Sequence, residues 1–385
     1  MEKLLDLQDL MLRFYTYEGV VKALEGVNLY VKKGETLGLV GETGCGKTMT
    51  GLSILFLIPS PGKIEGGSIF FKSKNRTLDL LSQDEPLLRS IRGKDISMIF
   101  QEPSSALNPL FTVENQISEV LLHHRREELA KKVLEGIERD LQSMKGGPRG
   151  FIYGLERKIY KKMLEKPHSL SMKLLSRIPI VRRYQRRLKK EARKEVVKIL
   201  GEMEIPDPER VADMYPHELS GGMQQRVVIA MALACNPTLL IADEPTTNLD
   251  VTIQAQILNL IKKLKKEFGS SILYITHDMG VIAEMCDRVA VMYAGSVCEI
   301  ADVIEIFKNP IHPYTKALLE SIPRPGKEFK SIIGMVPSLI NPPTGCRFHP
   351  RCLKAMEICS QVKPEITQVK KGHFVKCHLY TGRAK

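Results

Sequence analysis

The chain has 385 residues, of which 43% are apolar, enough to bury the core of one large α/β domain plus a small appendage. Its longest apolar runs, such as Val227–Cys235, are about half the ~18 residues that a membrane helix needs, so we expect no membrane span. The net charge is +13, and residues 121–200 hold 23 Lys and Arg against 9 Asp and Glu. This basic segment indicates a surface for nucleic acid or anionic lipid, or else a solvated helical face.

The elements predicted in chain order alternate between strands and helices. The N-terminus alternates charged and apolar residues, so we expect a strand there and no secretory signal. Further strands are predicted over 21–35, 36–41 and 95–100, and a helix from Lys47. Residues 116–200 are expected to be helical, with breaks at 145–150 and 165–170. Strands over 238–243, 271–276 and 289–295, with a helix over 254–268, complete the pattern of a largely parallel sheet covered by helices.

Residues 41–48 read GETGCGKT, a G-x-x-x-x-G-K-T phosphate loop between a predicted strand and a predicted helix. Its glycines let backbone N–H groups and the helix N-terminus converge on phosphate oxygens. Lys47 adds positive charge at the β- and γ-phosphates, and Thr48 offers a hydroxyl to Mg²⁺. The alternative for this stretch alone is a Gly-rich turn without a ligand. The loop residues predicted to bind nucleotide are Gly41, Glu42, Thr43, Gly44, Cys45, Gly46, Lys47, Thr48 and Met49.

Two adjacent carboxylates, Asp243 and Glu244, end the apolar strand LLIADE. Buried carboxylates are costly unless a cation or hydrogen-bond donors compensate them. Phosphoryl transfer explains the pair, because Asp243 can hold the Mg²⁺ shell while Glu244 orients or deprotonates the attacking water. On its own the carboxylate pair is weak evidence for a phosphoryl-transfer site, and together with the phosphate loop it becomes strong evidence.

A second anion-binding turn is predicted at Ser220, Gly221 and Gly222, which precede a long apolar helix. One nucleotide does not need two separated phosphate-binding turns. Two copies arranged head to tail would use both, because each copy would supply one turn to the other's nucleotide.

This combination resembles the ATP-binding cassette family, the nucleotide-binding subunits of ABC transporters, over nearly all of the chain outside the basic segment. In that family GETGCGKT corresponds to Walker A, LLIADE to Walker B, and LSGGMQ, which ends at Gln224, to the signature motif. The resemblance implies an α/β fold: a RecA-like mixed-sheet core, an antiparallel β-subdomain, an α-helical subdomain and a small C-terminal cysteine-containing extension.

Four single residues take their roles from the resemblance. Gln101 matches the Q-loop glutamine that contacts Mg²⁺ and senses the transport subunit, and His277 matches the switch histidine at the γ-phosphate. Asp250 ends TNLD, which resembles the D-loop that couples two nucleotide sites. Phe14 stands where the family places an aromatic on adenine, with Tyr15 and Tyr17 as rivals. The implied catalytic residues are Glu244, His277, Lys47 and Gln101, and the implied Mg²⁺ contacts are Thr48, Gln101 and Asp243.

Residues 215–258, 309–323 and 345–352 look like the ATPase subunits of dipeptide and oligopeptide importers, of the D type. This implies an ATPase domain over 1–325, a helical subdomain over about 102–225 and a C-terminal extension over 326–385. A basic insertion over about 120–200 exceeds the usual linker and is a candidate for contact with anionic lipid or an acidic permease loop.

The implied partners are two permease subunits, a second, F-type ATPase and, indirectly, an extracytoplasmic solute-binding protein, at the cytoplasmic face of the membrane. Similar subunits serve oligosaccharide importers, so the solute is open. A soluble ATPase acting on nucleic acid is a weaker alternative, because the chain has neither two cassettes nor long coiled coils.

Four cysteines, Cys346, Cys352, Cys359 and Cys377, cluster near the C-terminus. Their spacing lacks the close ligand pair that structural zinc sites use, and disulfides are unusual in a reducing cytosol. Four thiolates are the normal ligands of an iron–sulfur cluster. The resemblance implies a [4Fe–4S] cluster here, while zinc, disulfides and free thiols stay open.

Overall fold

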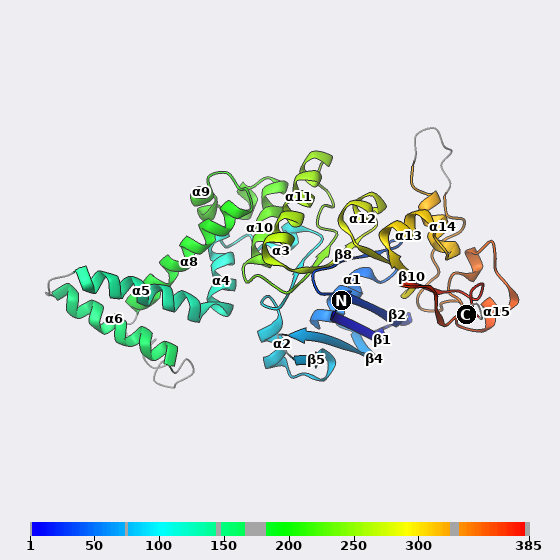
Figure 1. Cartoon of the computed structure of the whole chain (residues 1–385), viewed down its shortest axis with the longest axis horizontal. Coiled ribbons are helices and arrows are strands. Elements are labelled where there is room, and N and C mark those ends of the chain that lie inside the picture. Colours follow the sequence, from blue (N-terminus) through cyan, green and yellow to red (C-terminus); the bar gives the residue numbers. More distant parts are fainter. Residues whose placement is uncertain (1, 74–75, 144–147, 166–181, 324–330, 382–385) are drawn as a thin grey trace. The chain divides into compact units, whose positions relative to one another are not determined.

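The computed structural model describes residues 2–73, 76–143, 148–165, 182–323 and 331–381. The chain forms two compact units, one of Met1–Gln101 with Pro237–Lys385 and one of Glu102–Asn236. Figure 1 shows the elements of each unit. Within the described ranges, no helix is both long and apolar enough to cross a membrane.

The first unit contains a four-stranded antiparallel sheet in the order β2-β1-β4-β5. Its strands are β1 (Lys3–Thr16), β2 (Gly19–Lys32), β4 (Gly62–Ser73) and β5 (Arg76–Asp79). The sequence patterns predicted β1 and β2 but not β4, whose middle is interrupted by Gly66 and Gly67. Glycine pairs weaken a strand signal and mark irregular pairing, and the β1–β4 register shifts between Gln8 and Leu12, opposite these glycines.

The same unit contains an eight-stranded sheet in the order β11-β12-β10-β9-β3-β8-β7-β6. Neighbouring strands from β9 to β6 are parallel, as predicted, and the pairs from β9 to β11 are antiparallel. The strands are β3 (Thr36–Val40), β6 (Ile96–Ile99), β7 (Leu239–Asp243), β8 (Ser271–Thr276), β9 (Arg288–Tyr293), β10 (Ser296–Asp302), β11 (Ile366–Lys370) and β12 (His373–Lys376).

The helices of this unit follow the predicted alternation with strands. They are α1 (Lys47–Leu55), α2 (Glu85–Ile91), α11 (Val251–Phe268), α12 (Met279–Met285), α13 (Val303–Lys308), α14 (Pro313–Glu320) and α15 (Glu357–Gln361). The helix α11 begins at an Asp250 cap and ends at Gly269, whose φ of 67° is the left-handed conformation that glycine adopts most easily.

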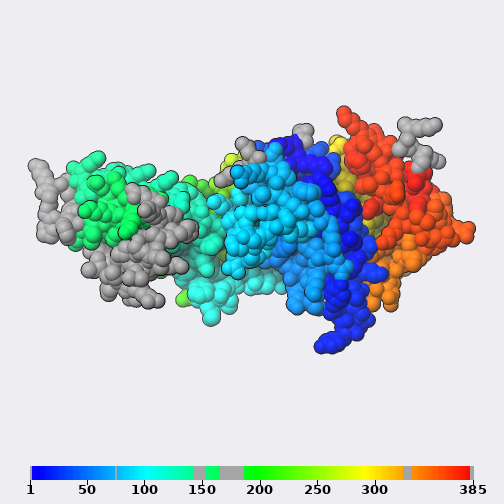
Figure 2. Space-filling model, turned by 90° about the horizontal axis from the view of Figure 1, so that it is seen from below, coloured from blue at the N-terminus to red at the C-terminus, as the bar shows by residue number. Residues whose placement is uncertain are grey.

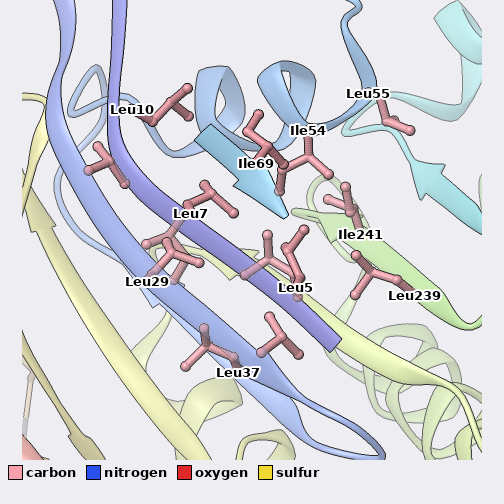
Figure 3. Packing of buried hydrophobic residues seen from close by; sticks show 14 of the residues in the cluster. Leu5, Leu7, Leu10, Leu29, Leu37, Ile54, Leu55, Ile69, Leu239 and Ile241 are labelled. Carbon is pink, nitrogen blue, oxygen red and sulfur yellow. The ribbon is translucent and has the colours of Figure 1, made fainter. Parts of the chain in front are cut away.

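The hydrophobic core of the first unit joins the two sheets through α1. Figure 3 shows leucines of β1 and β2 packed with side chains of α1, β3, β4 and β7. Leu5, Leu10 and Leu37 are completely buried. Burial of each such side chain contributes about 1.5–3 kcal/mol to folding, so this core holds the loop between β3 and α1 on a rigid base.

The C-terminal extension adds to the main sheet. Strand β12 pairs with β10, with Glu299 opposite Val375 and Ile300 opposite Phe374, and β11 pairs with β12. The small appended unit expected after residue 325 is therefore joined to the core by a sheet edge. The expected boundary itself, between 325 and 326, lies outside the described residues.

The second unit is helical. It contains α3 (Pro103–Ala106), α4 (Val113–His124), α5 (Arg126–Ser143), α6 (Pro148–Glu165), α8 (Arg182–Glu202), α9 (Pro208–Asp213) and α10 (Gly221–Leu233). Part of the positive charge of this unit is neutralised by ion pairs within it. Arg193 forms ion pairs with Glu114 and Asp213, and Arg187 Nε lies 2.9 Å from Oε2 of the buried Glu156. The expected breaks at 145–150 and 165–170 lie mostly outside the described residues.

Candidate functional site

The phosphate loop connects the end of β3 to the start of α1. Gly41 has φ 154°, and a Cβ at this position would lie 2.0 Å from the Met292 carbonyl oxygen, so no other residue fits. Gly46 precedes α1 with φ 100°. Lys47 is buried, and its Nζ donates to the carbonyl oxygens of Gly41 at 2.8 Å and Glu42 at 3.1 Å. The phosphate loop therefore encloses the Lys47 ammonium group, which two carbonyl oxygens of the loop hold in place.

Two predicted loop residues have their side chains engaged by the protein itself. The Cys45 thiol is fully buried, and burial raises its pKa. The Glu42 carboxylate accepts two hydrogen bonds from Arg351 of the C-terminal extension. Any contribution of Glu42 and Cys45 to phosphate binding therefore comes from their backbone.

Asp243 ends β7 beside the start of α1. Its Oδ1 accepts a hydrogen bond from the Thr48 hydroxyl at 3.2 Å. The Asp243 side chain is only 2% exposed, and this burial raises its pKa to about 6. A carboxylate and a hydroxyl on adjacent elements are the hard oxygen donors that suit Mg²⁺, so Thr48 and Asp243 fit that ion.

Glu244 is the centre of a hydrogen-bonded group formed with Gln101, Thr247 and His277. Its Oε2 accepts from Gln101 Nε2 at 3.1 Å and from the Thr247 hydroxyl at 3.0 Å, and its Oε1 lies 2.9 Å from His277 Nδ1. Its backbone has φ 45°, a left-handed conformation that costs energy in a non-glycine residue and is found preferentially at functional sites.

A pocket of about 510 Å³ brings these groups together with the adenine-side residues. Its lining includes the predicted residues Phe14, Thr43, Gly44, Gly46, Lys47, Thr48, Met49, Gln101, Glu244 and His277. The rivals of Phe14 are exposed, Tyr15 by 47% and Tyr17 completely, so Phe14 is the aromatic side chain that β1 presents to the pocket.

Four other residues line this pocket and were not predicted: Val21, Ala23, Thr247 and Leu339. Thr247 had a usable signal, because it lies in the segment between Glu244 and Asp250. Leu339 had none, since it lies more than sixty residues after His277, the last of the predicted motif residues of the main domain. It reaches the pocket because its carbonyl oxygen accepts a 2.8 Å hydrogen bond from the Lys22 backbone in β2.

The predicted signature residues lie in the second unit. Ser220 caps α10, where its hydroxyl accepts from the Met223 backbone at 3.4 Å, and Gly221 and Gly222 form the first turn. Gln224 donates to the Pro216 carbonyl oxygen at 2.8 Å, which fixes the preceding loop. In the first unit, Asp250 caps α11 by accepting from the Ile253 backbone at 2.9 Å.

The [4Fe–4S] cluster predicted at Cys346, Cys352, Cys359 and Cys377 is not supported by the geometry. All eight cysteines are free thiols. In the described ranges, no three His, Cys, Asp or Glu side chains are placed to hold a metal ion. Burial raises the pKa of Cys346 to about 11 and also raises the pKa of Cys352 and Cys377, which favours the protonated thiol in these three.

Two family models match the chain. The model for "ABC transporter" matches residues 24–247, and the model for "Oligopeptide/dipeptide transporter, C-terminal region" matches residues 298–359. The first match spans the phosphate loop, the signature motif and Glu244.

Known proteins are similar to this chain over its full length. The dipeptide transport ATP-binding protein DppD of Bacillus subtilis is 43% identical, covering 100% of this chain and 97% of the relative. The oligopeptide transport ATP-binding protein AppD of the same organism is 42% identical, covering 99% and 98%.

The fold also matches solved structures. The dimeric ATP-binding cassette MJ0796, in a post-hydrolysis state bound to ADP and Pi, superposes with a TM-score of 0.54 at 25% identity, covering 78% of this chain and 98% of that one. The predicted ATP-binding cassette fold is thus confirmed, with ATP and Mg²⁺ as the expected ligands. The chain belongs to the ABC transporter family, as an ATP-binding subunit of the ATPase class.

Proposed function

We propose that this chain is the ATP-hydrolysing subunit of an importer for dipeptides or oligopeptides, located at the cytoplasmic face of the membrane. The observation that carries the proposal is full-length similarity to dipeptide and oligopeptide transport ATP-binding proteins, combined with the Glu244 group. The peptide substrate comes from the names of those relatives.

In this proposal Glu244 accepts the proton of the attacking water, while Gln101 and His277 orient its two carboxylate oxygens. Lys47 binds the β- and γ-phosphates through its ammonium group. Thr48, Asp243 and Gln101 would hold Mg²⁺, which neutralises phosphate charge when it is bound. Phe14 would stack on the base.

A complete site would need a second cassette. The MJ0796 cassette is dimeric, which supports a head-to-tail pair in which Ser220, Gly221, Gly222 and Gln224 face the partner's nucleotide and Asp250 couples the two sites. We propose a non-identical F-type partner, two permease subunits and an indirect solute-binding protein. The expected division at 325/326, with a helical subdomain over 102–225, also stays a proposal.

Reconstitution tests the peptide assignment. The chain, combined with its second cassette and permeases in liposomes, should show ATP-dependent uptake of labelled dipeptides or oligopeptides. A labelled oligosaccharide serves as the competing solute. Uptake of the oligosaccharide without uptake of any peptide would contradict the assignment.

The basic insertion over 120–200 is proposed to contact anionic lipid. On α8, Arg186, Lys189 and Lys190 are exposed and so available to headgroups. Residues 144–147 and 166–181 of the insertion lie outside the described residues. Flotation with vesicles containing anionic phosphatidylglycerol should retain the wild type at low salt but less of a Lys189→Gln/Lys190→Gln variant. Lys33→Gln, at an exposed lysine of the other unit, is the control, and equal flotation of all three would contradict the lipid contact.

We also propose that the four C-terminal cysteines bind a [4Fe–4S] cluster. Support comes from the number and type of these side chains, because four cysteine thiolates are the normal ligand set of an iron–sulfur cluster. Anaerobically purified chain should contain stoichiometric iron and sulfide, which a Cys352→Ser variant loses and Cys235→Ser keeps. Stoichiometric zinc without iron would contradict the cluster.

A further inference from the structure

An arginine of the C-terminal extension binds the phosphate loop directly. Arg351 Nη1 donates to Glu42 Oε2 at 2.7 Å, and Arg351 Nη2 donates to Glu42 Oε1 at 3.0 Å. The Arg351 side chain is 5% exposed and the Glu42 side chain 24%, so this two-point ion pair is partly shielded from water. A planar guanidinium paired with a carboxylate in this way fixes orientation as well as charge.

The rest of the Glu42 residue is held as firmly. Its backbone N–H donates to the buried Tyr314 hydroxyl at 2.9 Å, and its carbonyl oxygen accepts from Lys47 Nζ at 3.1 Å. Arg351 in turn donates to the Tyr293 hydroxyl at 3.3 Å. A chain of hydrogen bonds therefore runs from Arg351 through Glu42 to the lysine that faces the phosphates.

The extension does not depend on Arg351 to stay on the core. Its Leu339 carbonyl accepts from Lys22, Arg347 donates to the Ala294 carbonyl oxygen, and Lys363 pairs with Glu25 at 2.7 Å. Figure 2 shows the extension, in orange and red, beside the blue N-terminal strands. These anchors and the β10–β12 pairing hold the extension on the core, so the partly buried Arg351–Glu42 ion pair is not needed for its attachment.

We propose that Arg351 is a positioning residue for the nucleotide: it holds Glu42, and through Glu42 the conformation of the phosphate loop that Lys47 needs. The proposal rests on ATP binding at this loop, as in the proposed function. Because coupling between two sites is reciprocal, ATP binding must also stabilise the extension around Arg351. The extension is then part of the nucleotide site, although no family motif for nucleotide binding lies in it.

Equilibrium titration with a fluorescent ATP analogue tests this, using Arg351→Gln, Glu42→Gln and the double variant. Each single variant should bind the analogue about tenfold more weakly than the wild type. The double variant should be no weaker than either single one, because the two side chains act as one unit. Arg351→Lys, which keeps the charge but not the two-point contact, should fall between the wild type and Arg351→Gln.

Lys363→Gln is the matched control, since it removes another ion pair of the extension and leaves the loop untouched. It should bind the analogue as the wild type does. Hydrogen exchange gives a second readout: ATP should protect backbone amides of residues 346–362 in the wild type and not in Glu42→Gln.

Additive losses in the double variant, a loss in Lys363→Gln as large as in Arg351→Gln, or unchanged affinity in both single variants would each overturn the positioning role. Should Arg351→Gln fail to fold, Arg351→Lys and Glu42→Gln carry the same comparison. A wild-type chain that binds no ATP would overturn the ATPase function itself, whereas wild-type binding with unaffected variants overturns only the role of Arg351.

Discussion

The Glu244→Gln variant is expected to hydrolyse ATP about 10²–10⁴-fold more slowly than the wild type while still binding it. The amide has the size of the carboxylate and can still accept from Gln101 and Thr247 through its oxygen, so the pocket keeps its shape. It cannot accept a proton from water at neutral pH. Replacing one carboxylate oxygen of Glu244 with an amide NH₂ is therefore expected to slow ATP hydrolysis and to preserve ATP binding.

Steady-state phosphate release and retention of labelled ATP on the purified complex measure the two quantities. Glu284→Gln is the control: it makes the same change at an exposed carboxylate of the same unit, paired with Lys262. Its turnover should equal that of the wild type. Undiminished hydrolysis in Glu244→Gln would show that another group accepts the proton.

Local motifs explain why much of the site could be predicted. The phosphate loop is eight contiguous residues between an apolar strand and a helix, and the structure ends β3 at Val40 and begins α1 at Lys47. Parallel strands bring their carboxyl ends to one edge, which explains why Asp243 at the end of β7 and His277 after β8 lie near that loop. Asp243 was predicted from the carboxylate pair at its strand end, whereas His277 was predicted from the family resemblance.

Contacts made across long stretches of sequence could not be predicted. Leu339 and Arg351 reach the nucleotide pocket and the phosphate loop because the extension docks on β2 and β10. No local periodicity encodes that docking, since it depends on a backbone hydrogen bond from Lys22, the β10–β12 pairing and the contacts of Arg347 and Lys363 with the core. The cysteines show the opposite problem: their number and the family resemblance suggested a metal, yet neither determines where the sulfurs point.

Burial of Asp243 is expected to make the stability of the metal-free protein fall as pH rises from about 4 to 6. The pKa of Asp243 in the folded state is about 6 because the side chain is desolvated, against an ordinary value of 3.8. The folded state thus holds a proton that the unfolded state has lost in this range, so ionisation costs folding free energy. A shift of about two pKa units corresponds to about 3 kcal/mol by pH 7.

The Asp243→Asn variant is the reference for this measurement, because its amide is neutral at every pH. Urea unfolding in EDTA at pH 4.5 and pH 7.5 should show the wild type losing stability relative to Asp243→Asn as pH rises. Mg²⁺ with a non-hydrolysable ATP analogue should restore the wild type at pH 7.5, because the cation compensates the buried carboxylate next to Thr48, and should do little for the variant. Parallel pH profiles for the two proteins would contradict the prediction, because they would mean that the fold does not raise the pKa of Asp243 and that its ionisation costs no folding free energy.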